Sequence, residues 1–179
     1  YVSKPINHFP LTETASKTYL MGGGIGITPM IAMAHRLHKI SADFTMHYGI
    51  RSRDDAGFLD DLAAAPWADR VHLHVSAEGS RAQLSQLLPY QKGAHVYCCG
   101  PDIYMTAVMD AAIENGFPDG ARHIEYFAVP EQPEFANHDF SLILKDGRTV
   151  PISANQSASD ALLTAGVHVD VKCADGLCG

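Results

Sequence analysis

The chain has 179 residues, of which 46% are apolar and 18% charged, and it carries a formal net charge of −7. This composition predicts a folded chain with a buried core and argues against intrinsic disorder. Because the lysines and arginines are scattered, with no basic run, nucleic acid is excluded as an expected partner. Glycines and a proline interrupt the longest apolar stretch, 19–33, so no membrane-spanning segment is predicted.

The first 127 residues alternate between strand-like and helix-like segments. In chain order, we predict a strand at 17–22, a helix at 28–40, a strand at 43–48, a helix at 56–64, a strand at 70–75, a helix at 81–88, a strand at 95–99, a helix at 102–115 and a strand at 123–127. Strands and helices that alternate at this spacing indicate βαβ units. The sequence therefore predicts an α/β fold, with a parallel sheet and helices on both of its faces.

The pattern changes after this region. Residues 129–138 contain prolines and polar side chains without periodicity, which is typical of a linker. Two β-prone runs, 140–144 and 149–152, flank an Asp-Gly pair and predict a hairpin. A helix is predicted at 157–165, with Ser157 as its N-cap and Asp160 completing a weak capping box.

A glycine-rich segment, Gly22-Gly-Gly-Ile-Gly-Ile-Thr-Pro-Met30, joins the first predicted strand to the first predicted helix. Glycines let the backbone approach a ligand closely, and the free N–H groups of a helix N-terminus suit a pyrophosphate. A glycine cluster can also be a simple structural turn. Its position at the carboxyl end of a strand, where ligands bind in such sheets, favours a nucleotide site.

Two cysteines, Cys98 and Cys99, end the fourth predicted strand of the first region. For Cys98 the expected role is that of a small buried hydrophobe. Cys99 precedes Gly100-Pro101, and we expect it to face the same crevice as the glycine segment. Because adjacent cysteines rarely bridge each other and a chain of this size needs no disulfide, the compartment is predicted to be reducing and cytoplasmic.

A second pair of cysteines, Cys173 and Cys178, has the spacing C-x4-C with a glycine between them. Plant-type 2Fe–2S sites begin with this spacing, although two free thiols would also satisfy it. Two pairs of histidines could suggest a metal site: His72 and His74, two residues apart, and His35 and His38, three residues apart. No carboxylate or cysteine accompanies them at zinc spacing, so these histidines are expected in the core or at the surface.

Together these motifs resemble the family of phthalate dioxygenase reductase and vanillate O-demethylase reductase. The resemblance is carried in order along the chain by His8-Phe-Pro-Leu11, the glycine segment, His47-Tyr-Gly-Ile-Arg51, His95-Val-Tyr-Cys-Cys-Gly-Pro101, His123-Ile-Glu-Tyr-Phe127 and the C-x4-C pair. It implies a ferredoxin-reductase-type NAD-binding domain at 12–128, the linker at 129–138 and the first half of a β-grasp 2Fe–2S ferredoxin domain at 139–179. Residues 1–11 would be the exit segment of a flavin domain that is missing here.

The resemblance also implies roles for individual residues. The nucleotide-binding set would be Gly23, Gly24, Gly26, Thr28, Arg51, Arg53, Asp54, Gly100 and Pro101. Cys99 would lie beside the nicotinamide, with Glu125 and Phe127 near the flavin, and Cys173 and Cys178 would be the first two cluster ligands. The cofactors would be NADH or NADPH, FMN and a 2Fe–2S cluster, and the partner a terminal oxygenase of the Rieske type.

The sequence departs from this family in two respects. The flavin barrel and the third and fourth cluster cysteines are absent from the sequence. The alternative is therefore a nucleotide-binding fragment or module of a flavoprotein reductase without turnover of its own. A flavohaem-type reductase domain is a weaker alternative, because it shares the glycine segment but lacks a C-terminal ferredoxin.

Overall fold

The computed structural model describes residues 7–79, 83–127 and 136–169. The chain divides into two compact units, Tyr1–Phe127 and Ala128–Gly179. No helix among the described residues is long and apolar enough to cross a membrane.

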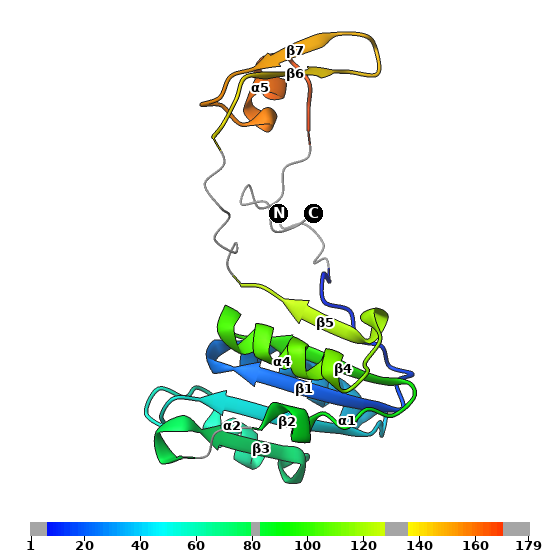
Figure 1. Ribbon diagram of the computed structural model, residues 1–179, viewed down its shortest axis with the longest axis vertical. Coiled ribbons are helices and arrows are strands. Elements are labelled where there is room, and N and C mark those ends of the chain that lie inside the picture. Colours follow the sequence, from blue (N-terminus) through cyan, green and yellow to red (C-terminus); the bar gives the residue numbers. More distant parts are fainter. Residues whose placement is uncertain (1–6, 80–82, 128–135, 170–179) are drawn as a thin grey trace. The chain divides into compact units, whose positions relative to one another are not determined.

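The first unit is built on a five-stranded parallel sheet with the strand order β3-β2-β1-β4-β5 (Figure 1). The strands are β1 (Lys17–Gly23), β2 (Phe44–Ile50), β3 (Val71–Val75), β4 (Ala94–Cys99) and β5 (Arg122–Glu125). The chain adds β2 and β3 on one side of β1 and then returns to add β4 and β5 on the other side. The strand order therefore reverses between β1 and β4, which is where open α/β sheets bind ligands.

Helices cover both faces of this sheet, as the sequence predicts. They are α1 (Ile27–Lys39), α2 (Leu59–Ala64), α3 (Leu84–Leu87) and α4 (Asp102–Glu114). Because side chains alternate along a strand, Leu20 packs into the core cluster under α1, while Tyr19 and Met21 pack into the cluster under α4. Figure 1 shows α4 lying across β1 and β4.

Two helices are shorter than the sequence pattern predicts. α2 begins at Leu59 and not at residue 56, because Phe58 adopts a left-handed backbone conformation with φ of 65°. α3 is a single turn, Leu84–Leu87, within the predicted range 81–88. Of these two helices, α3 reaches the functional site described below, through Leu84.

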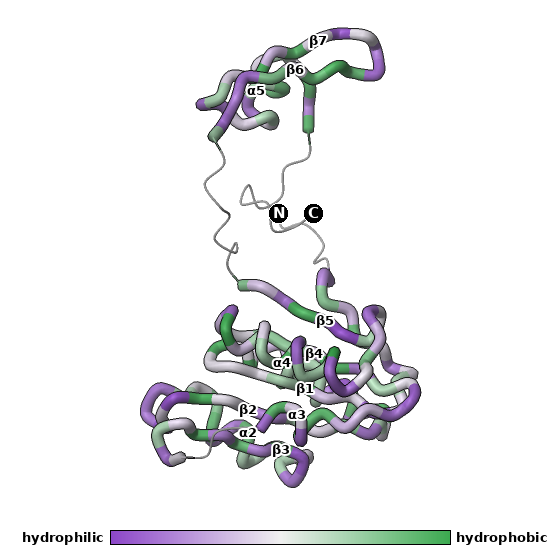
Figure 2. Tube along the Cα trace, in the orientation of Figure 1, coloured by the Kyte–Doolittle hydropathy of each residue, from purple (hydrophilic) through white to green (hydrophobic). Residues whose placement is uncertain are grey.

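The second unit contains an antiparallel hairpin of β6 (Phe140–Ile143) and β7 (Thr149–Ile152), followed by α5 (Ala158–Thr164). Val150, Ile152 and Ala161 form its small core. The turn between the strands is hydrophilic (Figure 2), with Gly147 at φ of 86°. At the start of α5 the backbone N–H of Asp160 donates to the hydroxyl of Ser157 at 3.1 Å, so the predicted N-cap is confirmed.

Candidate functional site

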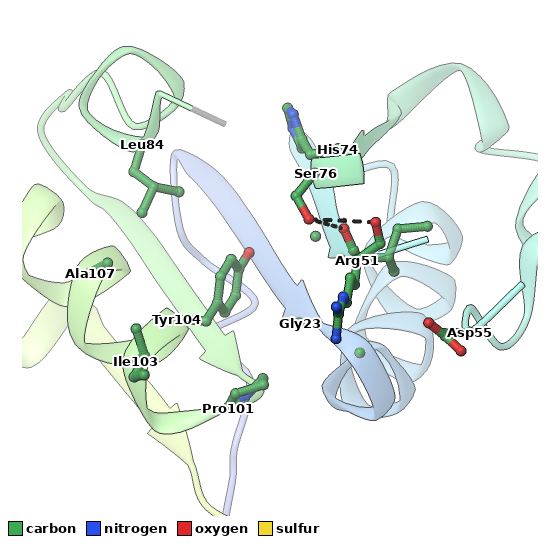
Figure 3. A pocket seen from close by; sticks show the side chains of 13 residues that line it. Gly23, Arg51, Asp55, His74, Ser76, Leu84, Pro101, Ile103, Tyr104 and Ala107 are labelled. Carbon is green, nitrogen blue, oxygen red and sulfur yellow. Dashed lines mark hydrogen bonds between the residues drawn. The ribbon is translucent and has the colours of Figure 1, made fainter. Parts of the chain in front are cut away.

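A cavity of about 500 Å³ opens at the carboxyl ends of β1 and β2, beside the point where the strand order reverses. One wall comes from α3 and α4 and presents Leu84, Pro101, Ile103, Tyr104 and Ala107 (Figure 3). The opposite wall comes from the ends of β2 and β3 and presents Arg51, Asp55, His74 and Ser76. Gly23, Gly24, Gly49 and Ile50 complete the lining.

Glycine is required at two positions of the cavity because the backbone there packs directly on Tyr104. A Cβ placed on Gly23 would lie 2.8 Å from Cδ1 of Tyr104, and a Cβ on Gly49 would lie 3.2 Å from its Cε2. The bare backbones of β1 and β2 thus allow the ring of Tyr104 to lie against both strand ends.

Gly26 and Gly100 join the two loops that leave β1 and β4. A Cβ on Gly26 would lie 2.2 Å from the carbonyl oxygen of Cys99, and a Cβ on Gly100 would lie 2.9 Å from the Cα of Gly23. Neither residue lines the cavity. Thr28 does not line it either, and its hydroxyl donates a hydrogen bond to the carbonyl oxygen of Ile25 at 3.1 Å. These residues shape the loop around the cavity from outside.

The charged residues after β2 have different environments. Arg53 forms a two-pronged ion pair with Glu78, at 2.8 and 3.2 Å, and neither Arg53 nor Asp54 lines the cavity. Arg51 lines the cavity, and within the described part of the chain its guanidinium has no hydrogen-bond or ion-pair partner. Asp55 also lines it and accepts a hydrogen bond from Ser52 at 2.8 Å. Among the described residues, the cavity therefore presents one positive charge without a partner, on Arg51, and one carboxylate, on Asp55.

His74 is held in the cavity wall by a buried histidine behind it. Nε2 of His74 lies 3.1 Å from Nδ1 of His47, and the ring of His47 stacks on that of His72 with centroids 5.0 Å apart. Burial lowers the pKa of His47 to about 3, with His74 and His72 adding to the effect. His47 is thus neutral at physiological pH and can hold His74 through either a donated or an accepted hydrogen bond.

Cys99, Glu125 and Phe127 do not line this cavity. Cys99 is 1% exposed within the core cluster packed against α1, and burial raises its pKa to about 11, with Glu125 contributing. Its thiol is therefore protonated at neutral pH, which argues against a nucleophilic role. Phe127, beyond the end of β5, is 51% exposed.

Glu125 is paired with Cys99 in the β4–β5 register and lines a second groove, of about 410 Å³. Residues of the N-terminal segment and α1, among them Phe9, Pro29 and Met33, complete that groove. Burial raises the pKa of Glu125, and the nearby His8 partly offsets this. The structure thus places Glu125 and Cys99 together, apart from the residues that line the larger cavity.

The predicted cluster ligands, Cys173 and Cys178, lie outside the described residues. Among the residues that are described, no group of three or more histidines, cysteines or carboxylates could hold a metal ion.

Of the predicted nucleotide-binding residues, the cavity brings together Gly23, Gly24, Arg51 and Pro101. Sequence reasoning missed Gly49, Ile50, Asp55, His74, Ser76, Leu84, Ile103, Tyr104 and Ala107. One signal was available for part of this set, because Ile103 and Ala107 stand four residues apart and must share a face of α4.

Comparisons with known proteins agree with this architecture, although no family model matches the chain. It is 40% identical over 180 residues to the phenoxybenzoate dioxygenase subunit beta of Ectopseudomonas oleovorans, an alignment covering 99% of this chain and 55% of that protein. It is 37% identical to a vanillate O-demethylase oxidoreductase of a Pseudomonas species, covering 99% of this chain and 57% of the relative. The chain thus spans somewhat more than half the length of these curated relatives.

Solved structures give the same result. The structure of phthalate dioxygenase reductase, described as a modular structure for electron transfer from pyridine nucleotides to 2Fe–2S, matches with a TM-score of 0.71 and 32% identity. That match covers 99% of this chain and 56% of the reductase. A self-sufficient cytochrome P450 monooxygenase matches with a TM-score of 0.82 and 36% identity, over 98% of this chain and 23% of that protein. Along essentially its whole length, the chain therefore belongs to the family of phthalate dioxygenase reductase and vanillate O-demethylase oxidoreductase.

Proposed function

We propose that this chain is the nicotinamide-nucleotide-binding part, with the beginning of the ferredoxin part, of a reductase that serves a terminal oxygenase. In this proposal electrons pass from NADH through FMN and a 2Fe–2S cluster to the oxygenase. The observation that carries it is the cavity at the carboxyl end of β1, where an unpaired arginine faces a glycine backbone that suits a pyrophosphate. The names of the relatives, reductase components of oxygenase systems, support the same assignment.

The fit of a dinucleotide to this site follows from its chemistry. The cavity extends from Pro101, after the end of β4, to His74, near the end of β3. Its α4 wall is mostly apolar. Arg51 supplies positive charge for phosphate or ribose oxygens, while Gly23 and Gly24 keep the backbone open. Bound NADH would supply a hydride, and the role of this chain is to bind and orient the nucleotide that carries it.

We assign 12–128 to the NAD-binding domain, 129–138 to a linker and 139–179 to the ferredoxin domain, with 1–11 as the exit from a flavin domain. Cys99, Glu125 and Phe127 would then face the flavin side of the NAD-binding domain, with Cys99 positioning the nicotinamide. Cys173 and Cys178 would be cluster ligands. The free thiols favour the reducing cytoplasm as the compartment.

The two arginines after β2 give a matched pair for testing nucleotide binding. Arg51→Gln should weaken NADH binding by at least about tenfold, because a charge-assisted contact to the nucleotide is lost. Arg53→Gln removes the same charge from an exposed ion pair outside the cavity and should change the affinity by less than about twofold. Calorimetric titration with NADH measures both, and equal effects of the two variants would remove the cavity assignment.

Turnover separates the reductase from the alternative, a nucleotide-binding module without activity. The experiment uses the chain within a protein of the relatives' length that contains a flavin domain. On anaerobic addition of NADH, the flavin absorbance should bleach, and it should bleach more slowly in Arg51→Gln than in Arg53→Gln at limiting NADH. A flavin that binds but is never reduced would favour the module.

A further inference from the structure

Tyr104 lies in the first turn of α4, with its ring against the ends of β1 and β2. The distances from virtual Cβ atoms give the direction of the ring. A Cβ on Gly23 would lie 2.8 Å from Cδ1 and 3.2 Å from Cε1 of the Tyr104 ring. A Cβ on Gly49 would lie 3.2 Å from its Cε2 and 3.6 Å from its Cζ. The ring thus crosses from β1 toward β2, and its hydroxyl-bearing carbon lies beside Gly49.

The hydroxyl of Tyr104 points into the cavity, toward the side of His74 and Ser76 (Figure 3). Gly49 is the register partner of His74, so the hydroxyl lies at the β2–β3 side of the cavity and away from Pro101. In sheets of this type, the residues after the second strand contact the adenosine ribose. The hydroxyl therefore faces the half of the cavity that an adenosine would occupy.

Most polar side chains that line the cavity already have a partner. Ser76 donates to the carbonyls of Ile50 and Arg51, Asp55 accepts from Ser52, and His74 pairs with His47. Within the described residues, the hydroxyl of Tyr104 has no hydrogen-bond partner, and Arg51 is the other lining side chain without one. Burial raises the pKa of Tyr104, so the phenol keeps its proton and remains a donor.

The hydroxyl is not among the buried polar atoms that lack a partner, so within the open cavity it can donate to a ligand or to water. We propose that the Tyr104 hydroxyl donates a hydrogen bond to the adenosine 5′-phosphate half of the bound nucleotide, making Tyr104 a nucleotide-binding residue of this site. The inference rests on the proposed function, because it requires a nucleotide in the cavity. A phenylalanine at this position would fill the same space against Gly23 and Gly49 but would leave the nucleotide without the donor.

The test compares Tyr104→Phe with Tyr90→Phe, which removes a hydroxyl from an exposed tyrosine that packs on Phe117 outside the cavity. Affinities for AMP and for ADP-ribose are measured by calorimetry on the 179-residue chain. Tyr104→Phe should weaken both ligands by the same factor, about 3- to 10-fold, as expected for one neutral hydrogen bond. Tyr90→Phe should leave both affinities within about twofold of the wild type.

The outcomes separate this inference from the function on which it rests. Equal affinities of wild type and Tyr104→Phe for AMP would overturn the inference while leaving nucleotide binding intact. A loss seen with ADP-ribose but not with AMP would also overturn it, because the contact would then lie in the other half of the ligand. If the wild type binds neither ADP-ribose nor NADH, the proposed function itself fails. Equal thermal unfolding midpoints of the two variants would show that the change in affinity is not a loss of fold.

Discussion

At the residue scale, the glycine that lies closest to a neighbouring backbone is Gly26, just outside the cavity. Any side chain there would meet the carbonyl oxygen of Cys99, at 2.2 Å from a Cβ, and this neighbour is backbone that cannot rotate away. The sequence marks Gly26 as one of several glycines near a pyrophosphate. In the structure, the close neighbour of Gly26 is instead the backbone of Cys99 and Gly100, in the loop that leaves β4.

Gly26→Ala should therefore lower the free energy of unfolding of the first unit by more than about 2 kcal/mol, as overpacking against a fixed neighbour does. The matched control is Gly120→Ala, where a Cβ would meet nothing within 4 Å. Trp67, the only tryptophan and 1% exposed in the first unit, reports unfolding in urea through its fluorescence. Equal urea midpoints for the two variants would contradict the close contact.

His47 couples stability to pH. Its pKa is about 3 in the folded chain, because of burial and of His74 and His72, against 6.5 for an unperturbed histidine. Below pH 6.5 the unfolded state binds a proton that the folded state refuses, so stability is lost as the pH falls from 6.5 toward 3. One such group contributes a slope of about 1.4 kcal/mol per pH unit within that window.

The corresponding test compares the wild type with His47→Phe, which keeps a ring against His72 but cannot titrate. Urea unfolding followed by Trp67 fluorescence at about pH 7 and about pH 5 should show a smaller loss of stability in the variant. Other histidines with lowered pKa values, such as His74 and His123, will keep some pH dependence in both proteins. If His47→Phe loses as much stability as the wild type, His47 is not the group responsible.

At the element scale, the strands were the most predictable part of the fold. Each of the five parallel strands lies within about two residues of its predicted range. The three central strands, β1, β2 and β4, are mostly buried and apolar, whereas the edge strands β3 and β5 are only partly buried and contain polar residues. The starts of α2 and α3 were not predictable. The left-handed conformation of Phe58 depends on tertiary packing and leaves no local signal in an apolar side chain.

The site was predictable only where a strand leads directly into it. Gly23, Gly24 and Pro101 end or follow strands and stand out in the sequence. Tyr104 reaches the cavity because of the orientation of α4, and His74 reaches it because of its position in the β2–β3 register. No local sequence pattern predicts either of these. The polar residues of α4 form a single stripe and the rest of the helix is apolar, so its sequence does not indicate that Tyr104 is the apolar residue that faces the cavity.

The N-cap of α5 gives a prediction for the second unit. Ser157→Ala removes the hydroxyl that accepts from the N–H of Asp160 and should destabilise α5 by about 1 kcal/mol. Ser157→Asn keeps a capping acceptor and should stay close to the wild type. Hydrogen exchange of the α5 amides, followed by mass spectrometry, should be faster in the alanine variant alone. Equal exchange in both variants would mean that the cap does not limit the stability of this helix.

At the scale of the whole molecule, the cavity at the carboxyl ends of β1 and β2 is built entirely from the first unit. All of its lining residues fall between Gly23 and Ala107. The second unit contributes its own hairpin, helix and small core, in the order expected at the start of a ferredoxin domain. Nucleotide binding should therefore be a property of the first unit, independent of the cluster that the second unit would help to hold.

The most direct test is an NMR titration of the isotope-labelled chain with NADH, read at the backbone amides. The account predicts saturable shifts centred on the amides of Gly23, Gly24, Arg51 and Tyr104, with no comparable shifts in α5. It would be contradicted by the absence of saturable binding at millimolar NADH, or by shifts that avoid the carboxyl ends of β1 and β2 and gather elsewhere.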